Sequence, residues 1–204
     1  MSFKKLKYTV IKEAISKDLA TYIYNYFLMK QQVYDTCIDF RYMSPYETMC
    51  GFYEGQDDQI PNTFSMYADP AMDTLLLKCQ PIVEKTTQLK LYPGYTYARR
   101  YKKGDVLKRH KDRPSCQIST TLHLGGDMWP IFIDPTGGDN IPTGNQVDLK
   151  IGDMLVYSGC DLEHWRDAFE GNVCVQTFLH YNDANGRFGK ENIFDKRPML
   201  GIPK

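Results

Sequence analysis

The most informative pattern in this chain is YKKGDVLKRHKD at residues 101–112. It has the form Tyr-x-x-Gly-x-x-apolar-x-x-His-x-Asp, and its glycine-punctuated strand pattern ends at Leu107. His110 and Asp112 follow at positions i and i+2. Because side chains alternate across an extended segment, these two side chains point the same way. The sequence therefore predicts an imidazole and a carboxylate on one face at the end of a strand.

A second pattern lies downstream at residues 147–158, where a polar turn precedes an apolar strand, Asp153 to Ser158. His164 follows this strand after a short connection. Two imidazoles and one carboxylate can hold one face of Fe(II) and leave the opposite face open to other ligands. We expect His164 to join His110 and Asp112 when the fold brings the strands side by side. The alternative interpretation is a core histidine, a turn aspartate and a surface histidine.

The ordered series of motifs from Leu91 to Asp183 resembles the 2-oxoglutarate/Fe(II)-dependent dioxygenases, and within them the prolyl-4-hydroxylase-like branch. Residues 112–116 (DRPSC) and 129–131 (WPI) look like bacterial and phage members of that branch. The resemblance implies that the two histidines and the aspartate named above hold Fe(II). It also implies 2-oxoglutarate as cosubstrate and O2 as oxidant, and it allows ascorbate as a further cofactor.

Helical patterns come first along the chain and strand patterns follow, which favours an α+β, mainly β layout with two packed sheets. The resemblance implies a double-stranded β-helix, the jelly roll of cupins, with the N-terminal helices packed on one sheet. We expect a single dioxygenase domain over residues 1–204. Its parts are a helical N-terminal region with a long irregular segment (1–87), a jelly-roll core (88–183) and a C-terminal tail (184–204).

Helix signals occur twice in the N-terminal region. Ser16 is a typical N-cap, and apolar residues spaced three and four apart follow it as far as Met29. Asp69 caps a second helix, which Pro81 should kink or break. Residues 35–61 show no clear period and are predicted to be irregular. Strands are predicted at residues 88–92, 95–101, 115–124, 129–134, 146–149, 153–158 and 173–181.

The formal net charge is zero, from 25 basic and 25 acidic residues, so no overall field attracts nucleic acid or an anionic membrane. Basic runs at residues 99–103 and 108–111 are interpreted as a solvated barrel rim rather than a nucleic-acid-binding face. No apolar stretch reaches the ~20 residues that cross a bilayer, and the N-terminus lacks a signal-peptide core. The six cysteines form no Cys-x-x-Cys pair, so we expect reduced thiols and a cytoplasmic location.

The carboxylate of 2-oxoglutarate that lies far from the metal needs a cation if the barrel partly desolvates it. Members of the family usually supply this cation from the strand after the second histidine. Here Cys174 stands at that position, and the nearest polar neighbour is the neutral Gln176. Arg166, two residues after His164, is the favoured replacement, and Arg113 is the second choice. The alternative for Arg166 is a loop arginine paired with a nearby acidic residue.

Three further residues are predicted to line the cosubstrate pocket. Alternation along their strand puts Thr121 and His123 on one face, and the family carries a polar residue there that helps hold 2-oxoglutarate. Tyr101 matches the tyrosine of the Tyr-x-x-Gly motif and adds a phenol. The alternatives are a sheet hydroxyl, a half-exposed imidazole and a packed aromatic ring. His180, near the end of the last strand, is interpreted as structural.

The resemblance predicts an oxygenase that hydroxylates a C–H bond of a prolyl peptide, an amino acid or another small substrate, with release of succinate and CO2. The expected partner is that substrate; membrane and nucleic acid are not favoured, and the oligomeric state stays open. One alternative is a non-catalytic metal-binding protein of the cupin type, which the missing basic residue at Cys174 keeps open. The other is a nucleic-acid-directed oxidative demethylase.

Overall fold

The computed structural model describes residues 3–44, 46–47, 51–54, 59–136 and 144–203. The helices are α1 (Phe3–Leu6), α2 (Lys17–Asp39), α3 (Pro70–Thr87) and the 3-10 helices η1 (Pro114–Cys116) and η2 (Lys190–Lys196). The strands are β1 (Tyr8–Ile11), β2 (Phe52–Glu54), β3 (Phe64–Tyr67), β4 (Leu91–Lys102), β5 (Leu107–His110), β6 (Ile118–Gly126), β7 (Ile131–Ile133), β8 (Asn145–Val147), β9 (Met154–Ser158), β10 (His164–Arg166) and β11 (Val173–Asp183). None of these helices is both long and apolar enough to cross a membrane.

The strands form two antiparallel sheets. The larger has seven strands in the order β1-β9-β6-β11-β4-β3-β2, and the smaller has four in the order β5-β10-β7-β8. From β4 onward the chain passes repeatedly between them, so that β4, β6, β9 and β11 lie in the larger sheet and β5, β7, β8 and β10 in the smaller. The mainly β layout with two sheets that the sequence predicts is confirmed.

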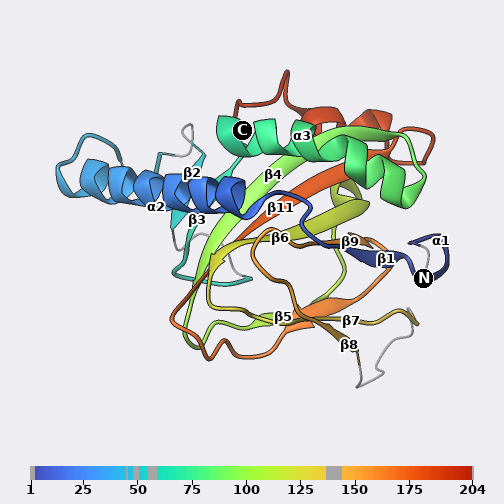
Figure 1. Cartoon of the computed structure of the whole chain (residues 1–204). Helices are drawn as coiled ribbons and strands as arrows, with labels where there is room; N and C mark the ends of the chain where they lie inside the picture. The colour runs from blue at the N-terminus through green and yellow to red at the C-terminus, as the bar shows by residue number, and fades with distance from the viewer. Residues whose placement is uncertain (1–2, 45, 48–50, 55–58, 137–143, 204) are drawn as a thin grey trace.

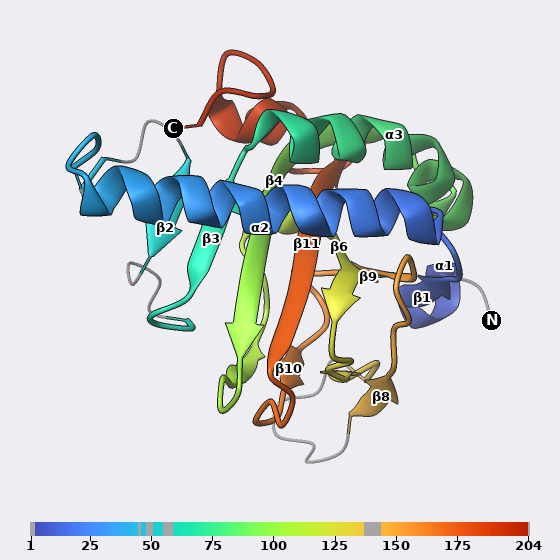
Figure 2. The same cartoon turned by 60° about the vertical axis from the view of Figure 1, so that its left-hand side comes forward.

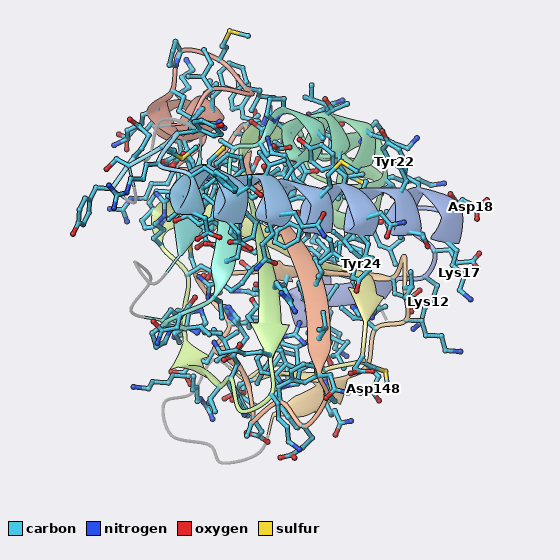
Figure 3. All side chains as sticks on the ribbon, turned by 90° about the vertical axis from the view of Figure 1, so that its left-hand side faces the viewer. Lys12, Lys17, Asp18, Tyr22, Tyr24 and Asp148 are labelled. Atoms are coloured by element: carbon cyan, nitrogen blue, oxygen red, sulfur yellow. The ribbon has the colours of Figure 1, made fainter. Side chains whose placement is uncertain are left out.

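The helices α2 and α3 cover one face of the larger sheet, and the smaller sheet lies on its other side (Figures 1 and 2). Leu122 and Leu179 of the larger sheet belong to the hydrophobic core that both helices share. Tyr24 lies on the side of α2 that faces the sheet, over Gly125, whereas Tyr22 is exposed (Figure 3). Because side chains alternate along each strand, those of opposite parity point toward the smaller sheet.

The helix α2 is longer than the sequence indicates. Ser16 caps it as predicted, its hydroxyl accepting a backbone hydrogen bond at 3.2 Å. The helix continues beyond Met29 to Asp39 because apolar side chains such as Tyr34 still bury against the core. It and β2 occupy parts of the segment 35–61, which was expected to be irregular. That segment also includes residues outside those described.

At two prolines the elements of the structure continue where the sequence predicts a kink or an end. Pro81 lies inside α3 without dividing it, and Leu77, whose carbonyl loses its partner, is half exposed, so water can replace the missing bond. The strands predicted separately at residues 88–92 and 95–101 are joined in the single strand β4, where a register shift beside His180 accommodates Pro93. Gly94 fits closely there, since an added Cβ would lie 3.0 Å from the His180 carbonyl oxygen.

The C-terminal residues pack against α3 and β4. Arg197 is buried, and its guanidinium donates to Asp73 of α3 and to the Gly94 carbonyl, each at 3.1 Å. Just before it, residues 194–196 adopt left-handed backbone angles, which turn the Asp195 carboxylate inward. The tail therefore reaches the end of the larger sheet at which the chain enters η1.

Candidate metal centre and adjoining pocket

His110, Asp112 and His164 meet at one end of the smaller sheet. β5 and β10 pair with His110 directly opposite His164, and the two imidazole centroids lie 4.3 Å apart. Asp112 follows β5, and its Oδ1 lies 3.6 Å from Nε2 of His110 and 3.5 Å from Nε2 of His164. Donor atoms of the three residues all lie within 4.8 Å of one another. One divalent cation therefore fits among them, with all three donors on one side.

The other ring nitrogens of both histidines face backbone carbonyls. Nδ1 of His110 lies 2.7 Å from the Lys108 oxygen, and Nδ1 of His164 lies 3.1 Å from the Leu162 oxygen. A carbonyl only accepts, so each Nδ1 carries the proton and each Nε2 keeps a lone pair. Outer hydrogen bonds of this kind orient the imidazoles that bind metals. Both histidines thus present the nitrogen that a cation needs.

Asp112 stays ionised in this setting. Burial acts to raise its pKa, but the imidazoles of His110 and His164 beside it outweigh burial and hold the pKa well below the usual range. Burial likewise acts to lower the pKa of His110, and the contact with Asp112 raises it overall. A carboxylate and an imidazole next to each other each favour the charged form of the other. The cluster therefore offers an anionic oxygen between two imidazoles, a donor set that suits Fe(II) and other first-row divalent metals.

A second group of donors, Asp112, Cys116 and His180, also lies within 4.8 Å. It shares Asp112 with the first group, so one cation cannot use both sets in full. Burial raises the pKa of the Cys116 thiol to about 12, and the thiol contacts the Tyr95 hydroxyl at 3.1 Å. Nδ1 of His180 lies 3.1 Å from the Ser119 hydroxyl oxygen. A protonated thiol and an engaged histidine make this group the poorer cation site.

A cavity of about 350 Å³ opens beside the triad of His110, Asp112 and His164. One wall consists of side chains of one parity on β4, namely Tyr95, Tyr97, Arg99 and Tyr101. Phe178 and His180 of β11, Tyr157 of β9 and Ile131 of β7 complete the interior. Strand alternation from Tyr101 places Arg99 on this wall, although the sequence analysis did not select it. The cavity has room for small ligands next to the open side of the three donors.

Arg166 lies two residues after His164 on β10, so both side chains point to the same face, and only 1% of Arg166 is exposed. Its Nη2 donates to the Thr121 hydroxyl at 3.3 Å, and its Nη1 donates to the Trp129 carbonyl. Its Nε has no hydrogen-bond partner, and no carboxylate pairs with the guanidinium, among the residues that the structure describes. The alternative interpretation of Arg166, a loop arginine paired with an acidic residue, is therefore not supported by the described residues.

The other predicted pocket residues surround Arg166. The Thr121 hydroxyl donates to Gln176 Oε1 at 3.0 Å, and Gln176 Nε2 lies 3.1 Å from Nδ1 of His123. Burial, with the nearby charge of Arg166, lowers the pKa of His123 to about 4, so its imidazole is neutral and Nδ1 can accept from the amide. Tyr101 is buried and lies close enough to Arg166 for each group to affect the pKa of the other. We call the five residues Tyr101, Thr121, His123, Arg166 and Gln176 the inner chamber.

Arg113 has a different environment. Its guanidinium donates to both oxygens of Asp195, each at 3.0 Å, and half of its side chain is exposed. Asp195 also accepts a bond from the Tyr67 hydroxyl at 2.7 Å. We call these three residues the Asp195 clamp. Because Arg113 already has a carboxylate partner, it is the weaker choice for an anionic ligand.

Comparisons with known proteins identify the fold. No family model matches the sequence, and none of the curated proteins is significantly similar to it. A prolyl-4-hydroxylase from Pseudomonas putida superposes with a TM-score of 0.57 and 13% identity, covering 87% of this chain and 94% of that one. The epimerase SnoN from nogalamycin biosynthesis, described as non-haem and α-ketoglutarate-dependent, gives a TM-score of 0.66 with 12% identity and covers 99% and 92%.

A third similar structure contains ligands. HygX from Streptomyces hygroscopicus, with nickel, 2-oxoglutarate and hygromycin B bound, gives a TM-score of 0.62 and 15% identity, covering 91% of this chain and 86% of that one. At such low identities the likeness establishes a common fold and nothing finer. This chain has the fold found in these 2-oxoglutarate-dependent enzymes.

Proposed function

We propose that this protein is an Fe(II)/2-oxoglutarate-dependent oxygenase built on a double-stranded β-helix. The observation that carries the proposal is the pairing of two features in one barrel. His110, Asp112 and His164 converge within 4.8 Å at the open cavity, and Arg166 lies buried beyond them with no carboxylate partner among the described residues. A cation-binding triad beside a buried, uncompensated arginine suits a ligand that chelates a metal at one end and carries a carboxylate at the other.

The triad would hold the metal, since two neutral imidazoles and a carboxylate form the facial ligand set of non-haem Fe(II) oxygenases. Iron bound there would activate O2 for oxidation of a C–H bond, coupled to conversion of 2-oxoglutarate to succinate and CO2. Nδ1 protons held on the Lys108 and Leu162 carbonyls keep both imidazoles turned toward the cluster. The chain itself supplies ligation, orientation and exclusion of water.

The inner chamber would hold the distal carboxylate of 2-oxoglutarate. Arg166 has a free Nε and a full positive charge to offer, and a buried charge of this kind is costly until an anion pairs with it. Thr121 can turn its hydroxyl from Gln176 to the ligand, because a hydroxyl rotates freely. His123 and Tyr101 complete the walls as neutral groups, which leaves Arg166 as the one cation of the chamber.

The substrate would enter through the cavity that Tyr95, Tyr97 and Phe178 line. The similar structures act on different molecules, and hygromycin B is bound in one of them, so the fold does not select a substrate. We propose a small molecule, an amino acid or a prolyl peptide, with residues 35–61 contributing to selection. Gln59 of this segment lies 2.9 Å from His110 Nε2, and this contact supports a contribution of the segment to substrate selection.

We further propose that residues 1–204 act as one dioxygenase domain in the cytoplasm. The helices share their core with the larger sheet, which supports a single folding unit. The five described cysteines are free thiols, which suits a reducing compartment.

Formation of succinate from 2-oxoglutarate tests the proposal. The unaltered protein, given Fe(II), O2 and 2-oxoglutarate, should release succinate slowly even without a substrate and faster with one. Asp112→Ala should abolish this activity, because two imidazoles alone bind Fe(II) weakly and leave its geometry undefined. Undiminished succinate formation by Asp112→Ala would remove Asp112 from the site.

The non-catalytic metal-binding protein remains the second candidate, and the same assay separates it. Such a protein would bind Fe(II) or Ni(II) through the triad yet produce no succinate. The departure from the family pattern at Cys174 favours this second candidate, whereas Arg166, whose charge acts on Cys174, would supply the missing cation under the proposed function.

A further inference from the structure

The two carboxylate oxygens of Asp112 face different partners. Oδ1 faces the Nε2 atoms of His110 and His164, at 3.6 and 3.5 Å. Oδ2 points the other way and lies 2.6 Å from the hydroxyl oxygen of Ser119 on β6. The metal-facing oxygen thus belongs to a cluster on the smaller sheet, while the other oxygen is held by the larger sheet.

Ser119 has a single proton to donate, and two oxygen acceptors lie near it in addition to Nδ1 of His180. Asp112 Oδ2 is a charged acceptor at 2.6 Å, whereas the Cys116 carbonyl lies at 3.0 Å. The shorter, charge-assisted bond takes the proton. Ser119 then accepts from Nδ1 of His180, which lies 3.1 Å away. The result is a directed chain from His180 through Ser119 to Asp112.

The sheet register holds this chain in place. Ser119 of β6 stands directly opposite His180 of β11, and both are buried. The His180 imidazole also stacks on the Tyr95 ring, with centroids 4.5 Å apart and planes at 30°. Because ring and strand are both fixed, the imidazole has little freedom to swing away from Ser119. The chain is therefore rigid at the end remote from the metal.

Gly159 lets the Asp112 carboxylate and the Ser119 hydroxyl lie close to the main chain. A Cβ there would lie 2.3 Å from Asp112 Oδ2 and 2.7 Å from Ser119 Oγ, far inside normal contact distances. The Gly159 carbonyl also accepts from the Asp112 backbone N–H at 2.8 Å. Both the main chain and the carboxylate of Asp112 are thus packed against the chain that follows β9. Only a residue without a side chain fits at this point.

We propose that Ser119 and His180 are positioning residues for the metal, which fix the plane of the Asp112 carboxylate so that Oδ1 alone is presented to the cation. This inference rests on the proposed function only in requiring a divalent metal at the triad. Without Ser119 the carboxylate can rotate, and the binding-competent arrangement is populated for a smaller fraction of the time. His180, interpreted from the sequence as structural, then contributes through its proton on Nδ1.

Cobalt(II) binding measures this role without any need for turnover. Titration of the purified protein with Co(II), followed by its visible absorption, gives an affinity for the triad. Ser119→Ala should weaken that affinity at least about tenfold, the usual effect of losing an outer hydrogen bond to a metal ligand. The matched control is Thr120→Ala, which removes a neighbouring buried hydroxyl that accepts from the Leu179 N–H at 3.0 Å on the opposite face of β6. It should lower thermal stability but leave Co(II) affinity within about twofold of the starting protein.

Two variants of His180 separate hydrogen bonding from packing. His180→Asn keeps an N–H donor near the position of Nδ1, whereas His180→Phe keeps a ring on Tyr95 and removes the donor. The positioning role requires that Asn retain Co(II) affinity better than Phe. A purely structural role requires the reverse order, and that order would overturn the part of the inference that concerns His180.

Equal Co(II) affinity in Ser119→Ala and the unaltered protein, with both proteins folded, would overturn the positioning role and leave the proposed function standing. If the unaltered protein binds no Co(II) at all, the proposed function and this inference fail together. A loss confined to Ser119→Ala and His180→Phe, with Thr120→Ala unaffected, supports the inference.

Discussion

The inner chamber and the Asp195 clamp each contain an arginine close in sequence to a residue of the triad, yet the two arginines differ in burial and in charge pairing. Arg166 is 1% exposed and has no carboxylate partner among the described residues, whereas half of the Arg113 side chain is exposed and Asp195 binds it through both oxygens. A paired arginine on the surface needs nothing further. A buried one without an anion is incomplete until a ligand supplies the charge.

Under the proposed function, this difference distinguishes a binding site around Arg166 from a structural contact at Arg113. Sequence position places Arg113 beside Asp112 and Arg166 beside His164, so both are reasonable choices for the distal carboxylate. The decisive facts are the burial of each guanidinium and the presence or absence of Asp195 next to it. The Asp195 clamp connects the C-terminal tail to the mouth of the pocket. In the inner chamber the guanidinium of Arg166 is available to pair with an anionic ligand.

Replacement of Arg166 should have the largest effect on this comparison. A charged hydrogen bond contributes roughly 1.5–3 kcal/mol, so Arg166→Ala should raise the 2-oxoglutarate concentration needed for half-maximal activity at least about tenfold. The 2-oxoglutarate requirement of Arg166→Lys should fall between those of the unaltered protein and Arg166→Ala, because an ammonium keeps the charge but lacks the planar guanidinium with its paired donors. Titration of succinate formation with 2-oxoglutarate measures this, and Arg113→Ala is the matched control. An unchanged requirement in Arg166→Ala would move the carboxylate site elsewhere.

The neutral state of His123 should make the inner chamber sensitive to acid. Burial and Arg166 lower its pKa to about 4. In the unfolded chain this histidine titrates near its ordinary value of about 6.5, so the unfolded state binds more protons as the pH falls from about 6.5 to 4. Stability that is present above this window is lost within it, and His123 alone accounts for about 2 kcal/mol between pH 7 and pH 5.

Urea unfolding at the two pH values measures that loss. His123→Gln should reduce the difference between pH 7 and pH 5 by about 2 kcal/mol, while His180, whose pKa burial also lowers to about 4, retains its own share. A difference that is the same in His123→Gln and the unaltered protein would show that this imidazole is not held neutral in the chamber.

The smallest effect is expected at the clamp. Arg113→Ala removes a half-exposed ion pair, and such pairs stabilise folded proteins by about 1 kcal/mol or less. The free energy of unfolding should fall by about that amount, and the 2-oxoglutarate requirement should stay within about threefold. A rise as large as that expected for Arg166→Ala would erase the distinction between the two regions.

Strand alternation, a local signal, predicts that His110 and Asp112 share a face, whereas the approach of His164 is expected from the ordered series of motifs and its resemblance to a known fold. The structure brings the three residues together. The same alternation places Thr121 and His123 on the inner face of β6, beside Arg166. Their assignments as metal and cosubstrate ligands stay predictions. The mainly β layout also follows from local patterns.

Other features depend on which strands become neighbours, and local patterns do not carry that information. The contact of His180 with Ser119 arises from the register of β6 against β11, so His180 alone looks like an ordinary strand residue. Asp195 reaches Arg113 only because the tail folds back onto β4. The extension of α2 to Asp39 follows from burial against the sheet rather than from its own sequence pattern.

Anaerobic addition of 2-oxoglutarate to the Fe(II)-loaded protein shows whether the triad and the inner chamber bind this keto acid together. Chelation of iron by the keto acid produces a visible charge-transfer absorption band. We expect this band in the unaltered protein, only when both components are present, with no band in Asp112→Ala and a band that needs more 2-oxoglutarate in Arg166→Ala. Absence of the band from the unaltered protein at saturating concentrations of both components would contradict the assignment of the cluster and the inner chamber as one binding site.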